Sequence, residues 1–330
     1  MRVSLIGYYG KNFGDLLMLQ GILSQMPIHV THINILSYSD FDLNSIQYSK
    51  EIKLLVYNVT KLGFKHRIKL YRNCDYIIWG GGSCFNDVDG TGAVKQMLLA
   101  KVVNPRIKIQ YLGIGIDCKN NKLHWWYLKL ALILSDTFNV RDQDSYRLVS
   151  SFTKVTIGKD PIYYNEQWFA TINDYIDKNY IMVSYRNVKS YFPNQAENYL
   201  NDFIENLIGI IVHKGFTKIY IFDCDQKVDK KDNMQIYKAL CIALPKVSVI
   251  YKKTYQLDEL CSMIKKTSLM ITGRLHAAVV CNLYCNNFLL LNYSKKNESF
   301  MKEIGKLDCL INYSELQNNQ LFNDKLQQTM

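Results

Sequence analysis

An arginine and a histidine stand between two apolar runs in the segment Gly273–Ala277. The apolar residues 269–271 before it predict a buried strand, and the apolar residues after it predict a buried helix. Open α/β sheets bind ligands at such a turn, because the carboxyl end of the strand opens onto a crevice. Arg274 and the helix N-terminus both favour an anion, and His276 can transfer a proton near neutral pH. A structural arginine beside a capping histidine is the alternative.

A second arginine occupies a similar position. Arg186 lies in the segment Ser184-Tyr185-Arg186-Asn187, at the end of the strand predicted over Tyr180–Ser184. In a doubly wound sheet, Arg186 and Arg274 would point into one crevice. Because guanidinium groups bind carboxylates and phosphates, the pair predicts a ligand with two anionic groups. Two solvated surface arginines are the alternative.

Three glycine-rich segments also follow predicted strands. They are Gly7–Asp15, Gly80–Ser83 and Gly113–Ile116, and glycine lets the backbone turn tightly and approach a ligand. The first segment has neither the Gly-Lys-Ser/Thr end of a Walker loop nor a clean Gly-x-Gly-x-x-Gly pattern. Asn12 and Asp15 within it could cap the following helix. Capping and plain turns are therefore the alternatives to a ligand site.

Other polar clusters indicate chemistry less clearly. His29 and His32 are spaced like metal ligands, but no third ligand is evident. The aspartates at 223, 225, 229 and 232 lack the glycine and terminal glutamate of an EF-hand loop, so a solvated loop is predicted there. The nine cysteines form no Cys-x-x-Cys pair, which favours reduced, mostly buried thiols in a cytoplasmic protein.

The chain has 330 residues, enough for two domains, and a formal net charge of +11, which suits an anionic partner. Part of this charge lies in Lys61–Arg72, where basic and apolar residues interleave. This segment predicts either a peripheral membrane contact or a solvated helix face. No apolar run is long enough to span a bilayer, and the start at Met1 lacks a signal-peptide pattern. A cytoplasmic location is expected, at the inner face of the membrane if the contact forms.

Predicted strands and helices alternate along the chain, which favours parallel sheets of β-α-β units. The pattern loosens at Tyr163–Lys178, so residues 1–165 and 175–305 are predicted to form two doubly wound Rossmann-like domains facing each other across a cleft. The tail 306–330 either packs back as a helix or stays loose. The predicted strands cover residues 3–6, 33–36, 76–79, 107–112, 137–140, 155–157, 180–184, 218–222, 247–250, 269–271 and 288–291. The predicted helices cover residues 16–23, 93–102, 123–134, 195–213, 232–244, 257–266 and 275–282.

With these segments in order, the chain resembles the polysaccharide pyruvyl transferase family. The resemblance implies a GT-B-like fold of two Rossmann-like domains. It also implies transfer of the pyruvyl group of phosphoenolpyruvate onto two hydroxyls of a sugar, as a ketal. The similar motifs are Gly7–Asp15, Gly80–Gly82, Gly113–Gly115, Arg141-Asp142 followed by Ser145, Asp160-Pro161, Ser184–Arg186, Gly273–Ala277, and Tyr293 with Lys295 or Lys296.

This resemblance assigns roles to the residues at the two arginine-bearing turns. We expect His276 to be the acid–base catalyst, acting either on the methylene carbon or on the attacking hydroxyl. Arg186, Arg274, Leu275 and Lys295 are expected to bind phosphoenolpyruvate. This chemistry needs no metal or cofactor.

The acceptor side is expected to include Asn12, Asp15, Gly81 and Gly82. The acceptor would be a sugar of a surface polysaccharide or its lipid-linked precursor. A GT-B glycosyltransferase that uses a nucleotide sugar is the alternative, although no Glu-rich ribose-binding signature is evident near the C-terminal strands. A nucleic-acid binder would explain the net charge, but no known module or basic stripe with stacking aromatics is evident, so no nucleic-acid partner is expected.

Overall fold

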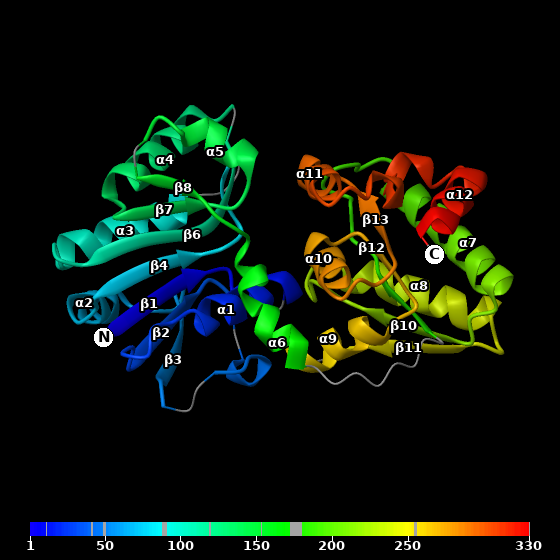
Figure 1. Cartoon of the computed structure of the whole chain (residues 1–330), viewed down its shortest axis with the longest axis horizontal. Coiled ribbons are helices and arrows are strands. Elements are labelled where there is room, and N and C mark those ends of the chain that lie inside the picture. The colour runs from blue at the N-terminus through cyan, green and yellow to red at the C-terminus, as the bar shows by residue number, and fades with distance from the viewer. Residues whose placement is uncertain are drawn as a thin grey trace. The chain divides into compact units, whose positions relative to one another are not determined.

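The computed structural model describes residues 1–10, 12–40, 42–48, 51–87, 91–118, 120–152, 154–171, 180–253 and 256–329. The chain forms two compact units (Figure 1). The first comprises Met1–Lys11 and Asp15–Trp168, and the second comprises Asn12–Gly14 and Phe169–Met330. The predicted start of the second domain, residue 175, lies outside the described residues.

The first unit is built on a parallel sheet with the strand order β3-β2-β1-β4-β6-β7-β8, and β5 pairs with β6. Its inner strands are nearly continuous apolar runs, as expected for strands that are covered on both faces. In β1, for example, every residue after the first is buried. The strands are β1 (Arg2–Gly7), β2 (His32–Ser37), β3 (Lys53–Asn58), β4 (Tyr76–Gly80), β5 (Ser83–Asn86), β6 (Lys108–Asp117), β7 (Thr137–Val140) and β8 (Val155–Ile157).

Helices connect these strands and cover the sheet. Tyr71, Met97, Leu128 and Val149, from four successive helices, belong to one core with side chains of β4, β6 and β7. Asn121 caps the fourth helix, because its side chain accepts the N–H groups of the first turn. The helices are α1 (Phe13–Ser24), α2 (Phe64–Arg72), α3 (Thr91–Val103), α4 (Lys122–Leu134), α5 (Gln143–Val149) and α6 (Glu166–Thr171), with 3₁₀ turns η1 (Leu43–Ser45) and η2 (Pro161–Asn165).

The second unit repeats this plan with a six-stranded parallel sheet in the order β11-β10-β9-β12-β13-β14. Gly215 ends its longest helix in a left-handed conformation, which glycine adopts without strain. The elements are β9 (Tyr180–Ser184), α7 (Ala196–Lys214), β10 (Lys218–Phe222), α8 (Lys230–Ala243), β11 (Ser248–Lys252), α9 (Leu257–Lys266), β12 (Leu269–Thr272), α10 (Leu275–Leu283), β13 (Phe288–Asn292) and α11 (Lys295–Glu303).

The tail after α11 packs onto the second unit. Its strand β14 pairs in parallel with β13 and completes the edge of the sheet. Phe322 and Leu326 of the last helix are buried in the core of this unit. The elements of the tail are η3 (Leu307–Cys309), β14 (Leu310–Asn312), η4 (Tyr313–Glu315) and α12 (Asn319–Thr329).

The predicted fold class is confirmed, because both units are parallel α/β structures of the Rossmann kind. The sequence analysis missed β3, β5 and β14. These strands lie at edges or off the main sheet path, and β14 has only three residues, so they lack a long apolar run. The glycine turn predicted at Gly113–Ile116 is wrong, because β6 continues through it with an irregular register against β7.

Candidate functional site

The winding direction of the second sheet changes between β9 and β12. The chain passes from β9 through β10 to β11 and then returns to β12, on the other side of β9. Ser184 and Thr272, the last residues of these neighbouring strands, are in register. Arg186 and Arg274 follow two residues after them. The two arginines therefore lie on adjacent turns at the carboxyl edge of one sheet, where this fold binds ligands.

Gly273 holds the two turns against each other. Its N–H donates to the carbonyl oxygen of Ser184 at 3.0 Å. A Cβ at position 273 would lie 2.8 Å from Cβ of Arg186, 3.0 Å from N of Arg186 and 2.6 Å from Oη of Tyr313. A side chain at position 273 would therefore push the Arg186 turn away from the Arg274 turn.

Arg274 is bound by a buried aspartate from the loop that follows β10. Its Nε and Nη2 donate to the two carboxylate oxygens of Asp229 at 2.8 Å and 2.6 Å, and Asp225 lies 3.7 Å from Nη2. The Asp229 side chain is fully buried and that of Arg274 is 12% exposed. The prediction of a solvated loop is therefore wrong for Asp229, and also for Asp223 and Asp232, which are buried too.

The electrostatics of this pair follow from its burial. Burial lowers the pKa of Arg274, but the Asp229 carboxylate outweighs burial and raises that pKa above its ordinary value. Burial raises the pKa of Asp229, and Arg274 offsets part of this rise. We treat the two groups as an ion pair, because short hydrogen bonds join the carboxyl group to a permanently protonated guanidinium.

A network of buried polar groups supports the turn after β9. Asn233 accepts the N–H of Tyr185 at 2.8 Å, donates to the Tyr185 carbonyl at 3.2 Å, and donates to Asp223 at 3.0 Å. Asn187 donates to Asp232 at 2.8 Å. Burial raises the pKa of both Asp223 and Asp232. The first turn of α8 thereby holds the backbone of Tyr185 and the side chain of Asn187, the two neighbours of Arg186.

Arg186 itself lies on aromatic rings. Its guanidinium carbon is 4.2 Å from the ring centroid of Tyr293 and 5.4 Å from that of Tyr191. Its carbonyl oxygen accepts a hydrogen bond from Oη of Tyr313 at 3.1 Å. Within the described part of the chain, Nε of Arg186 has no hydrogen-bond partner. Arg186 is therefore a positioned cation whose donors can bind an anion.

Positively charged side chains surround the buried ring of Tyr293. Burial raises the pKa of Tyr293, but Lys296, Arg186 and Arg274 outweigh burial and bring the pKa below its ordinary value. Nζ of Lys296 lies 5.8 Å from the Tyr293 ring centroid. Lys295, the lysine that we expected at the donor site, is an exposed residue at the start of α11. The structure therefore brings Lys296, the alternative allowed by the motif, to the cluster.

Two helix N-termini point to the same edge of the sheet. α10 follows β12 and α11 follows β13, and these two strands are neighbours. Their N-cap residues, Arg274 and Ser294, make no capping hydrogen bond with their side chains. Oγ of Ser294 is buried and has no partner among the described residues. Amide groups and a positive dipole end at each helix start favour an anion here.

His276 and Leu275 form the first turn of α10, and both side chains are half-buried. Gly14 lies against the imidazole: a Cβ at position 14 would be 1.8 Å from Nδ1 of His276. Only a glycine leaves room for the ring in this position. Gly14 of the N-terminal glycine motif therefore leaves the space that the imidazole of His276 occupies.

The segment Asn12–Gly14 belongs to the second unit. Phe13 N–H donates to the carbonyl oxygen of Cys224 at 2.7 Å, and Asn12 forms an antiparallel bridge with Asp225. Asn12, which we expected on the acceptor side, therefore lies against the loop that carries the aspartate partner of Arg274.

The other three expected acceptor residues belong to the first unit. Gly81 and Gly82 have φ angles of 76° and 80°, a conformation that favours glycine. Tyr9 donates from Oη to the carbonyl oxygen of Gly80 at 3.3 Å. Burial and then the Asp15 carboxylate raise the pKa of Tyr9. The Tyr9 hydroxyl is thus hydrogen-bonded to the residue before the glycine turn and is influenced by the Asp15 charge.

Three aromatic rings lie at the carboxyl ends of β1, β2 and β4. The ring centroid of Tyr8 is 5.2 Å from that of Tyr38 and 5.7 Å from that of Trp79. Trp79 is buried, whereas Tyr8 is 46% exposed. Tyr8 is thus a partly exposed ring held by two others, and aromatic faces of this kind contact the C–H groups of sugars.

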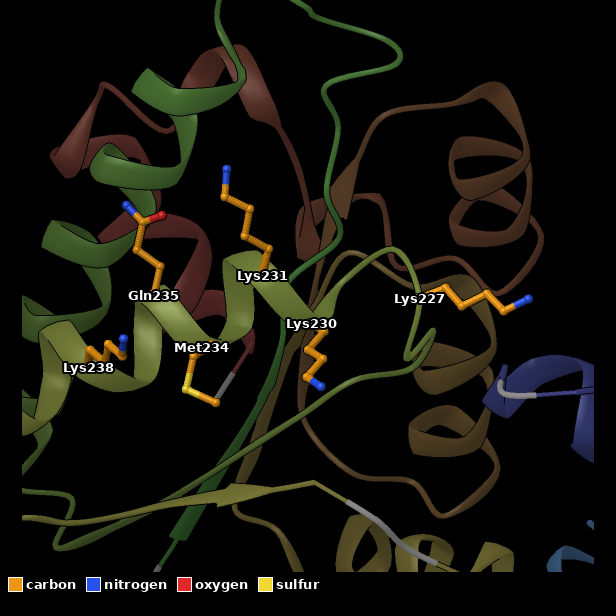
Figure 2. Close-up of a pocket in the computed structure, with 6 residues that line it drawn as sticks. All are labelled: Lys227, Lys230, Lys231, Met234, Gln235 and Lys238. Carbon is orange, nitrogen blue, oxygen red and sulfur yellow. The ribbon is translucent and has the colours of Figure 1, made fainter.

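A separate groove of about 590 Å³ follows the start of α8 and is lined by Lys227, Lys230, Lys231, Met234, Gln235 and Lys238. Figure 2 shows that Lys230 and Lys231 point to opposite sides of the helix, while Lys227 points away from both. Because these three ammonium groups diverge, they do not form a single binding point. We therefore place the candidate site at the arginine-bearing turns.

Neither metal clusters nor membrane spans are found in the part of the chain that the structure describes. No group of three or more His, Cys, Asp or Glu residues there could hold a metal ion. No helix there is long and apolar enough to cross a bilayer.

The sequence analysis missed Asp229, Tyr191 and Tyr313. The aspartate-rich loop after a predicted strand was a sequence feature that could have pointed to Asp229. Its burial, however, depends on Arg274, 45 residues further on. No such feature pointed to Tyr313, because it lies in a polar tail without a recognisable pattern. Contacts between distant segments bring both residues to the site.

Comparisons with known proteins agree with this geometry. A model of the family described as polysaccharide pyruvyl transferase matches residues 12–295. No curated protein sequence matches the chain. Among solved structures, UDP-GlcNAc 2-epimerase from Methanocaldococcus jannaschii has a TM-score of 0.63 at 14% identity, covering 99% of this chain and 92% of that one.

Two further structures are similar in the same way. S. aureus MnaA, solved with UDP, has a TM-score of 0.58 at 9% identity, covering 98% of this chain and 90% of that one. The E. coli ADP-heptose lipopolysaccharide heptosyltransferase II has a TM-score of 0.52 at 12% identity, covering 99% of both chains. At such low identity these likenesses show the GT-B-like fold alone. The family match spans most of the chain, and the chain belongs to the polysaccharide pyruvyl transferase family.

Proposed function

We propose that this protein transfers the pyruvyl group of phosphoenolpyruvate onto a sugar of a surface polysaccharide or of its lipid-linked precursor. The observation that carries the proposal is the cluster at the carboxyl ends of β9, β12 and β13. Arg186, Arg274 and Lys296 supply positive charge around the buried ring of Tyr293. Two uncapped helix starts add N–H donors. This set suits a small ligand with a phosphate and a carboxylate.

Phosphoenolpyruvate would be bound by both arginines, but to different extents. Arg186 has a buried Nε without a partner among the described residues, so it can fork onto one anionic group. Arg274 already uses Nε and one N–H of Nη2 on Asp229, so fewer of its five donors are left for the ligand. We therefore assign the main ionic contact to Arg186 and a supporting contact to Arg274. The N–H groups near Leu275 and the side chains of Lys295 or Lys296 would complete the site.

His276 would move the protons of the reaction. In the ketal-forming sequence, the methylene carbon of phosphoenolpyruvate gains a proton, and carbon 2 becomes electrophilic. A first sugar hydroxyl adds to carbon 2 and loses its proton, and the carbon–oxygen bond to phosphate breaks. A second hydroxyl then closes the ketal, and its proton leaves with the phosphate. His276 serves either the methylene carbon or an attacking hydroxyl.

The acceptor sugar is proposed to contact the rings and glycines of the first unit. Tyr8 offers a partly exposed aromatic face beside Trp79, and Asp15 offers a carboxylate that can accept hydrogen bonds from hydroxyls. Gly81 and Gly82 allow the backbone to approach a ligand closely. These contacts suit the polar and apolar faces of a sugar ring.

The test is to supply phosphoenolpyruvate or a nucleotide sugar to a panel of lipid-linked sugars. Product mass and phosphate release are the measurements. We expect phosphate release and a product heavier by one pyruvyl ketal. A product heavier by a sugar, formed from the nucleotide sugar alone, would overturn the proposal in favour of a glycosyltransferase.

His276→Ala is the matching variant, with His213→Ala at an exposed position of α7 as its control. The first change should abolish phosphate release and the second should leave it unchanged. Arg186→Ala should mainly raise KM for phosphoenolpyruvate. Normal turnover by His276→Ala would show that His276 is not the catalyst.

A further inference from the structure

Helices α2, α3 and α4 form one layer over a face of the first sheet. They follow one another along the sheet (Figure 1), and α3 packs against both neighbours. Tyr71, Met97 and Leu128 on their inner sides belong to the core with the strands. The opposite sides of these helices therefore form a continuous outer face, which we call the α2–α4 face.

The charged residues of the three helices that form the α2–α4 face are all basic. The three helices contain no aspartate or glutamate, although the whole chain has 29 of these residues against 40 lysines and arginines. The flanking segments carry carboxylates: Asp136 lies 3.9 Å from Lys101 after the end of α4, and Asp87 accepts the N–H of Asn121, the N-cap of α4. The eight basic residues of the helices are Lys65, Arg67, Lys69, Arg72, Lys95, Lys101, Lys122 and Lys129.

The same face exposes large apolar side chains. On α4, Leu123, Trp126 and Ile133 are 59%, 57% and 66% exposed, and their spacing puts them on one stripe of the helix. Val102 of α3 is 72% exposed and Phe64 of α2 is 60% exposed. Single exposed apolar residues are ordinary. A tryptophan-containing stripe on α4, together with exposed apolar side chains on the other two helices of the layer, indicates a partner surface.

We propose that the α2–α4 face docks on an anionic phospholipid bilayer, with the α4 stripe entering the head-group region. Basic side chains attract anionic head groups, and Trp, Leu and Phe side chains enter the boundary between head groups and acyl chains. A second copy of the chain fits less well, because pairing by this face would oppose basic residues to basic residues. The proposal is independent of the transfer reaction, since none of these residues belongs to the candidate site.

The test is co-sedimentation of the full chain with vesicles of phosphatidylcholine alone and of phosphatidylcholine mixed equally with phosphatidylglycerol. We expect binding to the mixed vesicles, weakened by salt, and little binding to phosphatidylcholine alone. Trp126→Ala should lower the partition coefficient about tenfold, because it removes one large inserted side chain. Lys65→Glu with Lys69→Glu should lower it at least about tenfold, because each basic residue contributes separately.

Matched controls lie on the second unit. Ile242→Ala and Val212→Ala remove side chains that are 83% and 66% exposed, and Lys246→Glu with Lys302→Glu makes the same charge change. These variants should bind vesicles like the unchanged protein. Equal binding to both vesicle types, or equal binding by Trp126→Ala and Ile242→Ala, would overturn the proposal. The proposal would also be overturned if light scattering showed a dimer that Trp126→Ala disrupts while vesicle binding stays unchanged.

Discussion

Arg274 and Asp229 form a two-pronged ion pair, with Nε–Oδ2 and Nη2–Oδ1 distances of 2.8 Å and 2.6 Å. Arg274 is the N-cap residue of α10, so the pair joins the start of this helix to the loop after β10. The next two residues are Leu275 and His276. The pair therefore sets the position of the helix turn that carries the proposed catalyst.

Breaking this pair should destabilise the second unit. Asp229→Asn leaves the mostly buried Arg274 guanidinium with Asp225, at 3.7 Å, as its nearest carboxylate, which costs up to about 3–5 kcal/mol of unfolding free energy. Chemical denaturation followed by circular dichroism measures the change, since all four tryptophans lie in the first unit. The double variant Asp229→Leu with Arg274→Met should recover most of the stability, because neither position then carries a charge that needs a partner. A loss below about 1 kcal/mol for Asp229→Asn would contradict the importance of the pair.

Gly273→Ala should separate the two arginine-bearing turns. The new Cβ would meet Cβ and N of Arg186 at 2.8 Å and 3.0 Å, so a destabilisation of about 1–3 kcal/mol and a raised KM for phosphoenolpyruvate are expected. Gly209→Ala on α7 is the control, because a Cβ there meets no atom within 4 Å. That change should stabilise the helix by about 0.5–1 kcal/mol. Equal effects of the two substitutions would show that the contact at Gly273 is unimportant.

Gly14→Ala should displace the imidazole of His276. The added methyl group would lie 1.8 Å from Nδ1, and a misplacement of about 1 Å can lower a rate about a hundredfold. The measurement is the rate of phosphate release at saturating phosphoenolpyruvate, together with the thermal midpoint. Gly63→Ala, where a Cβ meets no atom within 4 Å, serves as the control. Retained activity in Gly14→Ala would show that the histidine does not need this position.

Tyr313→Phe should loosen the Arg186 turn. It removes the hydrogen bond from Oη of Tyr313 to the Arg186 carbonyl, which contributes about 1 kcal/mol, and it keeps the buried ring. We expect a small loss of stability and a larger rise in KM than fall in kcat. A fall in kcat at unchanged KM would show that Tyr313 does not act through donor binding by Arg186.

The nine cysteines should differ sharply in reactivity. All are free, and only Cys241 and Cys285 are exposed. Burial raises the pKa of Cys74 to about 11 and that of Cys224 to about 12, so both stay thiols at pH 8 and react slowly. A disulfide reagent should titrate two thiols rapidly in the folded protein and all nine after denaturation. Rapid reaction of more than three thiols would contradict the packing described above.

Most of the strands in both units were predictable from apolar runs, because inner strands of a parallel sheet are buried on both faces. β3 and β14 were not, since an edge strand needs no continuous apolar run. The aspartate loop was misjudged for a different reason. Asp229 is paired with Arg274 and Asp232 with Asn187, each 45 residues away in the chain. Partners so distant cannot be read from the local sequence.

The sequence by itself determined the fold class and the family, through strands, glycine turns and the ordered motifs from Gly7 to Lys296. It also located Arg186, Arg274 and His276 at strand ends, because side-chain chemistry and local periodicity are properties of neighbouring residues. Only the tertiary structure decided that Asp229 binds Arg274, that Gly14 makes room for His276, and that Tyr313 supports Arg186. These contacts join residues far apart in the chain, so they depend on strand order and register, which no local pattern contains.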